Sequence, residues 1–489
     1  MPAYVLELIV VGLGLVLLLL EAFLPKLGAK GLGAIGIVGL LVVLFLLPGV
    51  TGEPGESAGI IWKFYTADSL AMFYKGLALI TTILVLVLSI EYAPVMKRFL
   101  GSGGGVGEYL VLPVFTCAGL MWMASAHDLT SIFVSLEVVT MSFYVMVAYM
   151  RRNVGSLEAG VKYLILGALS TGFLVYGIAF LFGITGQTNL NAIETVLAGM
   201  EGQNKIILFA FSLLLIALGF KVAAVPFQMW VPDVYQGAPT PTTAYLSVGS
   251  KAAGFIVLSR IVDTFLGDHW VVDGDGSFQG RIQAVLLFVA GATIIFGSLA
   301  AIAQTNFKRL LAYSSISHAG FLLLALACAY PSGVKMLASG EVVAFYLATY
   351  LPMTMAAFLV LCIIRSRLDN EEIDALDGLG KRSPFLAFVL LISIISLAGI
   401  PLTAGFLGKF FVFQSAIDQG HYVLLAIAIF GAAAGFYYYF KVIRSMYWNA
   451  PVGDVAVSPS MGSRVILISL CVAIIFLGLN PGVILGMLK

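Results

Sequence analysis

The segment LLLIALGFKVAAVPFQMW, residues 213–230, places a lysine and a proline inside an apolar run. A lysine at the centre of a bilayer costs about 2.5–3.5 kcal/mol on insertion scales. A proline inside a helix removes one backbone hydrogen bond and clashes with the preceding turn. Membrane proteins tolerate a broken helix where it is buried in protein or lines a wet cavity. Lys221 followed by Pro226 therefore predicts a broken transmembrane helix beside a polar pathway.

The composition of the chain is that of a polytopic membrane protein. Of its 489 residues, 61% are hydrophobic and 10% are charged, whereas soluble domains are about 45–50% apolar and roughly 25% charged. One water-soluble globule cannot enclose this excess, so lipid must cover much of it. The formal net charge of +1 gives no basic surface for nucleic acid. The predicted fold class is all-α integral membrane.

Apolar segments long enough to span a bilayer follow one another along the chain, and we count about fourteen of them. The first, Ala3–Leu24, lacks a basic start and a cleavage pattern, so we interpret it as a retained helix. The segment Ser383–Asp418 is too long for one straight span and is expected to be broken. Most lysines and arginines between segments lie in one set of alternate loops, which predicts that both termini are on the outer face.

A second interrupted helix lies in SLAGIPLTAGFLGKFFVF, residues 396–413, where Lys409 follows Pro401. Two long helices, each with a proline break and a lysine, are typical of inverted repeats in transporters. Lys221 precedes its proline and Lys409 follows its own, so the expected repeat is one of architecture rather than of sequence.

Glu137 is the one carboxylate that lies deep within a predicted helix. Burial favours the neutral forms of a carboxylate and of an amine, whereas proximity of the two favours both charged forms. Separating such a pair would let the amine release its proton. We therefore interpret Glu137 as the regulator of Lys221, with a static ion pair that fixes helix packing as the alternative.

Other polar residues within apolar segments are candidates for proton transfer or have structural explanations. Lys251 lies about ten residues into its segment and is a second relay candidate. His318 could relay protons, because imidazole titrates near neutral pH, or could simply be hydrogen-bonded. Lys75 and Lys162 lie near helix ends, from which long side chains can reach water. Asp233 is expected to cap the segment that follows it.

Four cysteines lie far apart in apolar stretches and form no CxxC pair. This pattern predicts no metal site and no iron–sulfur cluster in the chain. We expect small buried side chains instead. The four are Cys117, Cys328, Cys362 and Cys471.

Two motifs resemble the antiporter-like subunits of respiratory complex I (NADH-quinone oxidoreductase), a family related to Mrp antiporters. They are GFKVAAVPFQMWVPDVYQGAPTPTTAYLSVGSKAAGF, residues 219–255, and FKRLLAYSSISHAGFLL, residues 307–323. The stretch VPDVYQGAPTP followed by Lys251 looks like the N-type subunit in particular. The resemblance implies fourteen transmembrane helices with two inverted five-helix repeats, each containing a broken helix. It divides the chain into N-terminal helices (1–107), a first repeat (108–280), a second repeat (281–450) and a last helix (451–489).

The resemblance also implies roles for individual residues. Glu137 and Lys221 match the family's acid–lysine pair, Lys251 matches the connecting lysine of N-type subunits, and Lys409 matches the lysine of the second broken helix. Lys162 and His318 match further positions of the central axis. Many relatives have a histidine where this chain has Gln228, and glutamine orients water but holds no extra proton. Either bound waters bridge Lys221 to Lys251 or the proton route avoids this point.

The function implied is proton translocation in the bacterial inner (plasma) membrane, coupled to quinone reduction elsewhere in the complex. NADH, flavin, iron–sulfur clusters and quinone would bind to partner subunits, and this chain would hold no cofactor or metal. Its implied neighbours are another antiporter-like subunit and small membrane subunits. Three alternatives remain open at this stage: an Mrp-type cation/proton antiporter subunit, a membrane anchor without conduction, and an independent secondary transporter.

Overall fold

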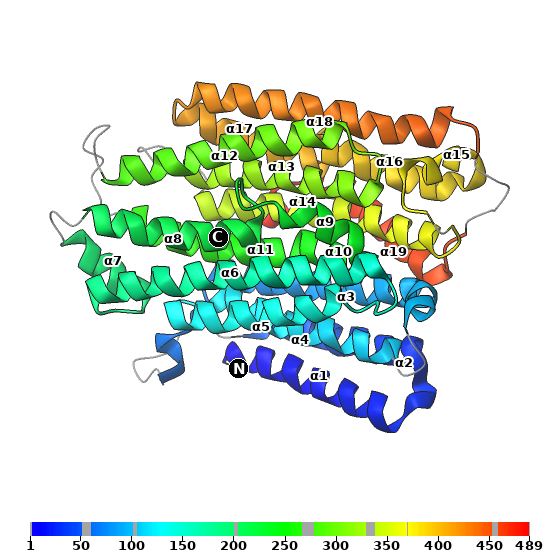
Figure 1. Cartoon of the computed structure of the whole chain (residues 1–489), viewed down its shortest axis with the longest axis horizontal. Coiled ribbons are helices and arrows are strands. Elements are labelled where there is room, and N and C mark those ends of the chain that lie inside the picture. The colour runs from blue at the N-terminus through cyan, green and yellow to red at the C-terminus, as the bar shows by residue number, and fades with distance from the viewer. Residues whose placement is uncertain are drawn as a thin grey trace.

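The computed structural model describes residues 2–50, 60–100, 105–199, 204–266, 278–328, 338–368, 370–451 and 458–488. These residues form a bundle of helices whose axes lie roughly along one common direction, with the chain passing back and forth (Figure 1). The first half contains α1 (Tyr4–Phe23), α2 (Gly28–Leu46), α3 (Ser69–Phe99), α4 (Val106–Ser125), α5 (Leu129–Val147), α6 (Val154–Thr185), α7 (Leu190–Ala198), α8 (Asn204–Val222), α9 (Trp230–Gly237), α10 (Thr240–Tyr245), the π-helical turn η4 (Leu246–Ser250) and α11 (Lys251–Leu266).

The second half contains α12 (Phe278–Ile302), α13 (Phe307–Cys328), α14 (Ser339–Arg365), α15 (Leu379–Arg382), α16 (Pro384–Ala398), α17 (Ala404–Asp418), α18 (Tyr422–Trp448), α19 (Met461–Leu479) and α20 (Gly482–Leu488). In the described residues, thirteen helices are long and apolar enough to cross a membrane. The prediction of an all-helical membrane protein is therefore confirmed. The predicted count of about fourteen differs because the Ser383–Asp418 segment is divided into α16 and α17.

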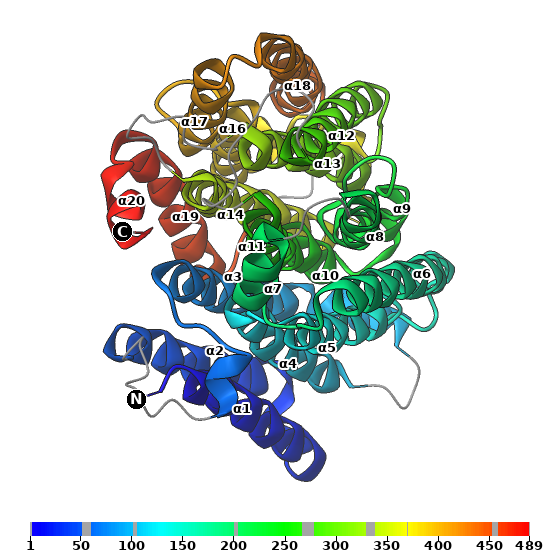
Figure 2. The same ribbon diagram turned by 90° about the vertical axis from the view of Figure 1, so that its left-hand side faces the viewer.

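The bundle has an enclosed centre and a lipid-facing rim. Seen along the helices, α10, α11 and α14 lie in the middle, whereas α1, α2, α6 and α18 lie at the edge (Figure 2). The segment Thr240–Leu266 and helices α13 and α14 are almost wholly buried, whereas only 28% of the residues are buried in the most apolar part of α1, α2, α6, α18 and α19. Polar side chains on the central helices are therefore shielded from lipid.

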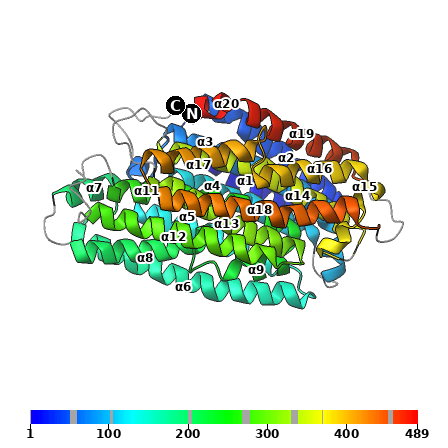
Figure 3. The ribbon, with the colours of Figure 1, turned by 90° about the horizontal axis from the view of Figure 1, so that it is seen from above.

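The two ends of the bundle differ in character. One end, the terminal face, holds the start of α1, α7 and α20, so both chain ends lie toward the same side (Figure 3). The other end, the basic face, holds α15 and the start of α13, where Lys308 and Arg309 lie.

Two of the long helices are interrupted within the bundle. Helix α8 ends at Val222 and α9 begins at Trp230, with Pro226 between them. Helix α16 ends at Ala398 and α17 begins at Ala404, with Pro401 between them. Each proline thus lies in the irregular segment rather than in a helix, as expected from its missing backbone donor.

Helices α12 and α13 touch backbone to backbone through glycines. A Cβ on Gly320 would lie 2.7 Å from the backbone nitrogen of Ile294, and one on Gly297 would lie 2.5 Å from that of Ser317. Small residues allow such close approach of membrane helices. This contact fixes the position of α13, which carries His318.

We expect Gly320→Val to lower the thermal stability of the purified protein, because overpacking a tight contact costs about 1–3 kcal/mol. The measurement is the Tm of the detergent-solubilised protein. Gly172→Val is the matched control, since Gly172 lies in helix α6 and a Cβ there would meet no atom within 4 Å. Equal Tm values for the two variants would show that the α12–α13 contact does not constrain the bundle.

Candidate functional site

Three buried lysines lie beside irregularities in the central helices. Lys221 is in the last turn of α8, Lys251 is the first residue of α11 after the π-helical turn, and Lys409 follows the second break in α17. Their exposed fractions are 7%, 2% and 6%. Helix ends leave backbone groups without partners inside the helix, and such groups can bind buried polar side chains.

The second break shows how one amine is held. Lys409 Nζ donates to the carbonyl oxygens of Leu397 at 3.0 Å and Ala398 at 2.8 Å, which end helix α16. The end of a helix carries partial negative charge, which stabilises a cation. Gly399, with φ of +88°, turns the chain away, and a Cβ there would lie 2.9 Å from Lys409 Cδ. The break itself therefore builds the amine's binding site.

Lys221 and Glu137 lie in the same region but make separate contacts. Lys221 Nζ donates to the hydroxyl of Thr140, one turn along α5 from Glu137. Glu137 instead accepts a hydrogen bond of 2.7 Å from Thr171 on α6. The carboxylate still acts electrostatically on the amine. The structure thus brings the two residues together without an ion-pair contact between them in the described part of the chain.

Lys251 binds α13 and lies on a chain of hydroxyl groups. Its Nζ lies 2.5 Å from Ser315 Oγ and also contacts the Ser315 carbonyl oxygen. Ser315 Oγ is in turn 3.3 Å from the hydroxyl of Tyr235, which comes from α9. The Tyr350 ring, whose hydroxyl lies 3.0 Å from Ser247 Oγ, is 5.9 Å from the amine. Lys251 therefore contacts α13 and lies beside a ring of α14, and the hydroxyl contacts of these two neighbours extend to α9 and η4.

His318 continues this polar row along α13. Its Nδ1 lies 2.7 Å from the Tyr346 hydroxyl and its Nε2 3.3 Å from the Tyr439 hydroxyl. Lys251 binds Ser315, and Lys409 Nζ lies 5.5 Å from the centroid of the Phe321 ring. His318 is one turn from each of these two residues on α13 and therefore lies between the two lysines. Lys251, His318 and Lys409 thus form one side of a buried row.

The other part of the row, from Lys221 to Lys251, is less continuous. The two helices touch here, since a Cβ on Gly254 of α11 would lie 3.5 Å from Lys221 Cβ. Gln228 lies buried in the first break, and its Oε1 has no hydrogen-bond partner among the described residues. Buried polar groups of this kind are usually satisfied by ordered water.

Lys162 lies outside this row, although the family resemblance places it on the axis. Its side chain is 41% exposed and forms ion pairs with Glu158 at 2.7 Å and Asp233 at 2.8 Å. Asp233 also pairs with Arg309 at 2.7 Å. The expectation that Asp233 caps the following segment is wrong, because it lies in the first turn of α9 and links α6 to α13.

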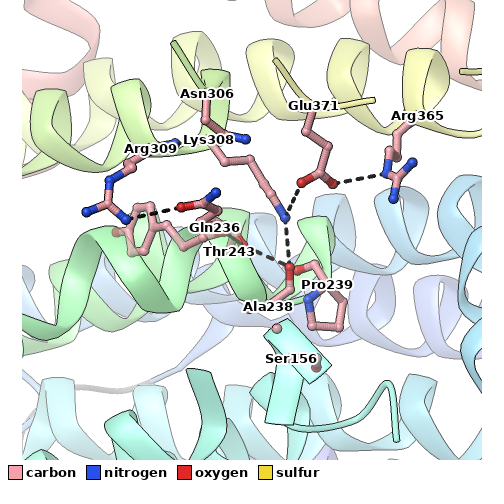
Figure 4. A network of polar contacts seen from close by, with 12 residues as sticks. Ser156, Gln236, Ala238, Pro239, Thr243, Asn306, Lys308, Arg309, Arg365 and Glu371 are labelled. Carbon is pink, nitrogen blue, oxygen red and sulfur yellow. Dashed lines mark hydrogen bonds and ion pairs between the residues drawn. The ribbon is translucent and has the colours of Figure 1, made fainter. Parts of the chain in front are cut away.

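Lys162 and Asp233 line a cavity of about 440 Å³ on the basic face, which we call the vestibule. Figure 4 shows its charged network, in which Lys308 bonds Glu371 at 2.9 Å and the Ala238 carbonyl oxygen at 3.0 Å. Glu371 also contacts Arg365 at 3.3 Å. Helix α9 separates this network from Lys251, since it carries Asp233 toward the vestibule and Tyr235 toward Ser315.

Lys308 and Arg365 are among the lysines and arginines that the sequence suggests lie in loops, and the sequence does not point to Glu371. Lys308 is only 1% exposed, and the Glu371 side chain is only 13% exposed. A lysine beside an arginine at the start of a helix gives no signal of burial. The carboxylate that compensates it lies 63 positions later, since 371 − 308 = 63.

Comparison with known proteins identifies relatives of the whole chain. A sequence model described as "NADH:quinone oxidoreductase/Mrp antiporter, TM" matches residues 126–435. NADH-quinone oxidoreductase subunit N 2 of Solibacter usitatus is 41% identical over 85% of this chain and 80% of its own length. Subunit N of Desulforamulus reducens is 36% identical over 96% of this chain and 93% of its own length.

Solved structures agree with this result. A chain of respiratory complex I from Thermus thermophilus with bound aureothin superposes with a TM-score of 0.79 at 30% identity, covering 98% of both chains. A chain of the Mrp complex from Dietzia shares the fold, with a TM-score of 0.77 at 21% identity over 99% of this chain and 96% of its own. The chain therefore belongs to the NADH:quinone oxidoreductase/Mrp antiporter family, in its group of NADH-quinone oxidoreductase N subunits.

Proposed function

We propose that the chain is the proton-translocating N-type membrane subunit of an NADH:quinone oxidoreductase and moves protons along the buried row of Lys221, Lys251, His318 and Lys409, with Glu137 as regulator. The identity to N subunits over nearly the whole chain supports the assignment to this complex. The burial of three lysines in the central helices supports the route.

The observation that carries this proposal is the nature of the partners of the three amines. In the described residues, Lys221 contacts a hydroxyl, Lys251 contacts a hydroxyl and a carbonyl, and Lys409 contacts two carbonyls. A carboxylate in direct contact would hold the proton on a buried amine, because separating the charges is costly. Neutral acceptors stabilise the ammonium form less, so these amines can both take up and release a proton.

The vestibule is the proposed intake. Excess Lys and Arg mark the cytoplasmic side of bacterial membrane proteins, which supports an orientation with the basic face inside the cell and both termini outside. From the vestibule, Tyr235 and Ser315 lead across α9 to Lys251. Gln228 orients water between Lys221 and Lys251, in place of a titratable histidine.

Inverted repeats at residues 108–280 and 281–450, flanked by segments 1–107 and 451–489, remain part of the proposal. Their support is the direction of the broken helices. Helix α8 runs from the terminal face into its break, whereas α16 runs from the basic face into its own (Figure 1). Opposite directions of two such helices are what an inverted-topology repeat produces.

Electron transfer belongs to partner subunits in this account, which hold the NADH site, flavin, iron–sulfur clusters and quinone. The chain's neighbours are another antiporter-like subunit and small membrane subunits. An Mrp-type antiporter is the alternative, which the shared fold alone supports. Purification of the native assembly distinguishes the oxidoreductase subunit from the antiporter subunit, because flavin and iron–sulfur subunits accompany this chain only in the oxidoreductase.

We expect Lys251→Met in the assembled complex to abolish most proton pumping, because methionine fills the space but carries no proton. The measurement is the number of protons moved per NADH oxidised in proteoliposomes. Lys205→Met is the control, since Lys205 is exposed at the start of α8. Normal assembly with an unchanged proton ratio for Lys251→Met would refute the proposed route.

Lys409→Arg separates proton transfer from a purely structural role. Arginine keeps a positive charge near the Leu397 and Ala398 carbonyls but does not deprotonate in proteins. We expect a variant that assembles and loses at least about a hundred-fold in pumping rate, the lower end of the range for removing a proton-transfer group. Assembly is measured by gel and activity by proton uptake. Full pumping by Lys409→Arg would favour a membrane anchor instead.

A further inference from the structure

A second buried acid–lysine pair lies near the terminal face, apart from the central row. Lys75 of α3 is 0% exposed, and its Nζ lies 2.8 Å from Glu7 Oε1 of α1. The Tyr65 hydroxyl donates to the same Glu7 oxygen at 3.0 Å and also contacts Lys75. The expectation that Lys75 reaches water is therefore wrong, because its charge is compensated inside the protein.

A second ion pair lies about 10 Å away along α3, at the start of that helix. Asp68 caps α3 and receives two hydrogen bonds from Arg260, at 3.1 and 3.0 Å. Its side chain is 43% exposed, whereas Arg260 is buried. The charged groups that act on Lys75 are Glu7, Asp68 and Arg260. We call these four residues the outer cluster, and Asp68 is its contact with water.

Two buried atoms of the outer cluster are unsatisfied. Glu7 Oε2 and Arg260 Nε have no hydrogen-bond partner among the described residues. Buried polar atoms are bonded to protein or to ordered water in nearly all proteins. Glu7 Oε1 accepts from Tyr65 and contacts Lys75, so Oε2 is the oxygen of this carboxylate that has no partner among the described residues. This oxygen is available to accept a proton or a water molecule.

The outer cluster is connected to the central row through α11. That helix begins at Lys251 and carries Arg260 about 14 Å further along its axis. A cavity of about 10 Å³ has a mostly apolar lining, formed by Tyr74, Leu77, Ala78, Leu120 and Ala124 of α3 and α4 and by Gly249, Ala252 and Ala253 of η4 and α11. This volume is close to the minimum for one water molecule, and the Tyr74 hydroxyl is the one side-chain polar group in the lining. Tyr74 and Ala124 adjoin Lys75 and Ser125, while Gly249 and Ala252 flank Lys251.

We propose that the outer cluster is the site from which this subunit releases protons to the terminal face. The inference rests on the proposed function of the central row. The ammonium of Lys251 gives one proton through water to the Glu7 carboxylate, leaving a neutral amine and a neutral acid. The proton then passes to Asp68 and to external water, and Glu7 becomes a carboxylate again.

Lys75 gives the release its direction. While Glu7 holds the extra proton, the Lys75 ammonium is buried without a carboxylate beside it. An uncompensated buried charge is strongly unfavourable. The protonated state of Glu7 is therefore short-lived, and the cluster releases protons rather than storing them.

The test compares Glu7→Gln/Lys75→Met with wild type in the whole complex reconstituted in liposomes. The double variant removes both buried charges, and replacing a whole buried ion pair often leaves stability unchanged. Proton release predicts at least about a hundred-fold lower pumping rate with normal assembly. Wild-type pumping by the double variant would overturn the proposal and leave a static link between α1 and α3.

A control double variant and a second test variant distinguish loss of proton release from a general loss of function. Glu194→Gln/Lys205→Met removes one acid and one lysine from the same face, outside the cluster, and is expected to pump normally. If the double variant fails to assemble, Asp68→Asn tests the proposal in its place, because asparagine still caps a helix. Slower pumping by Asp68→Asn supports the proposal and unchanged pumping overturns it. Normal pumping by Lys251→Met in the same membranes would instead refute the proposed function.

Discussion

The structure depends on one constraint: an amine buried among apolar helices must find oxygen atoms that replace water. The second break satisfies this need most directly, because the carbonyl groups that end α16 point at Lys409. A continuous helix would have used those carbonyls in its own hydrogen bonds. The break is therefore the source of the binding site and not a defect beside it.

The same constraint divides the buried lysines into two groups. Lys75 and Lys308 contact carboxylates, at 2.8 and 2.9 Å, whereas Lys221, Lys251 and Lys409 contact hydroxyl and carbonyl groups. A carboxylate partner fixes the charge of the amine, and a neutral partner leaves it free to change. The second group forms the central row, which is where a change of protonation is required.

The sequence predicts the parts of this arrangement that depend on local chemistry. A proline and a lysine in one apolar run require a break and a polar environment, and both are found near Lys221 and Lys409. Partners far apart along the chain cannot be read in this way. Glu7 is 68 positions from Lys75, since 75 − 7 = 68, and the sequence gives no sign that the two residues meet. The position of Lys75 near a helix end suggested instead that its side chain reaches water. The packing of Lys75 against Glu7 of α1 and against Tyr65 decides the opposite.

The position of Lys162 has a similar explanation. A lysine near the start of a helix can lie either in the central row of buried lysines or at the protein surface. The packing of α9 against α6 brings Asp233 to Lys162, and the two side chains pair in the vestibule. The gap at Gln228 likewise depends on how α8 and α11 approach each other.

The most direct measurement is a cryo-EM map of the assembled complex at a resolution that shows ordered water. Our account predicts waters at Gln228 that join Lys221 to Lys251, and a polar chain that continues past His318 to Lys409. A dry, apolar separation between these lysines in every state of the turning-over complex would contradict it.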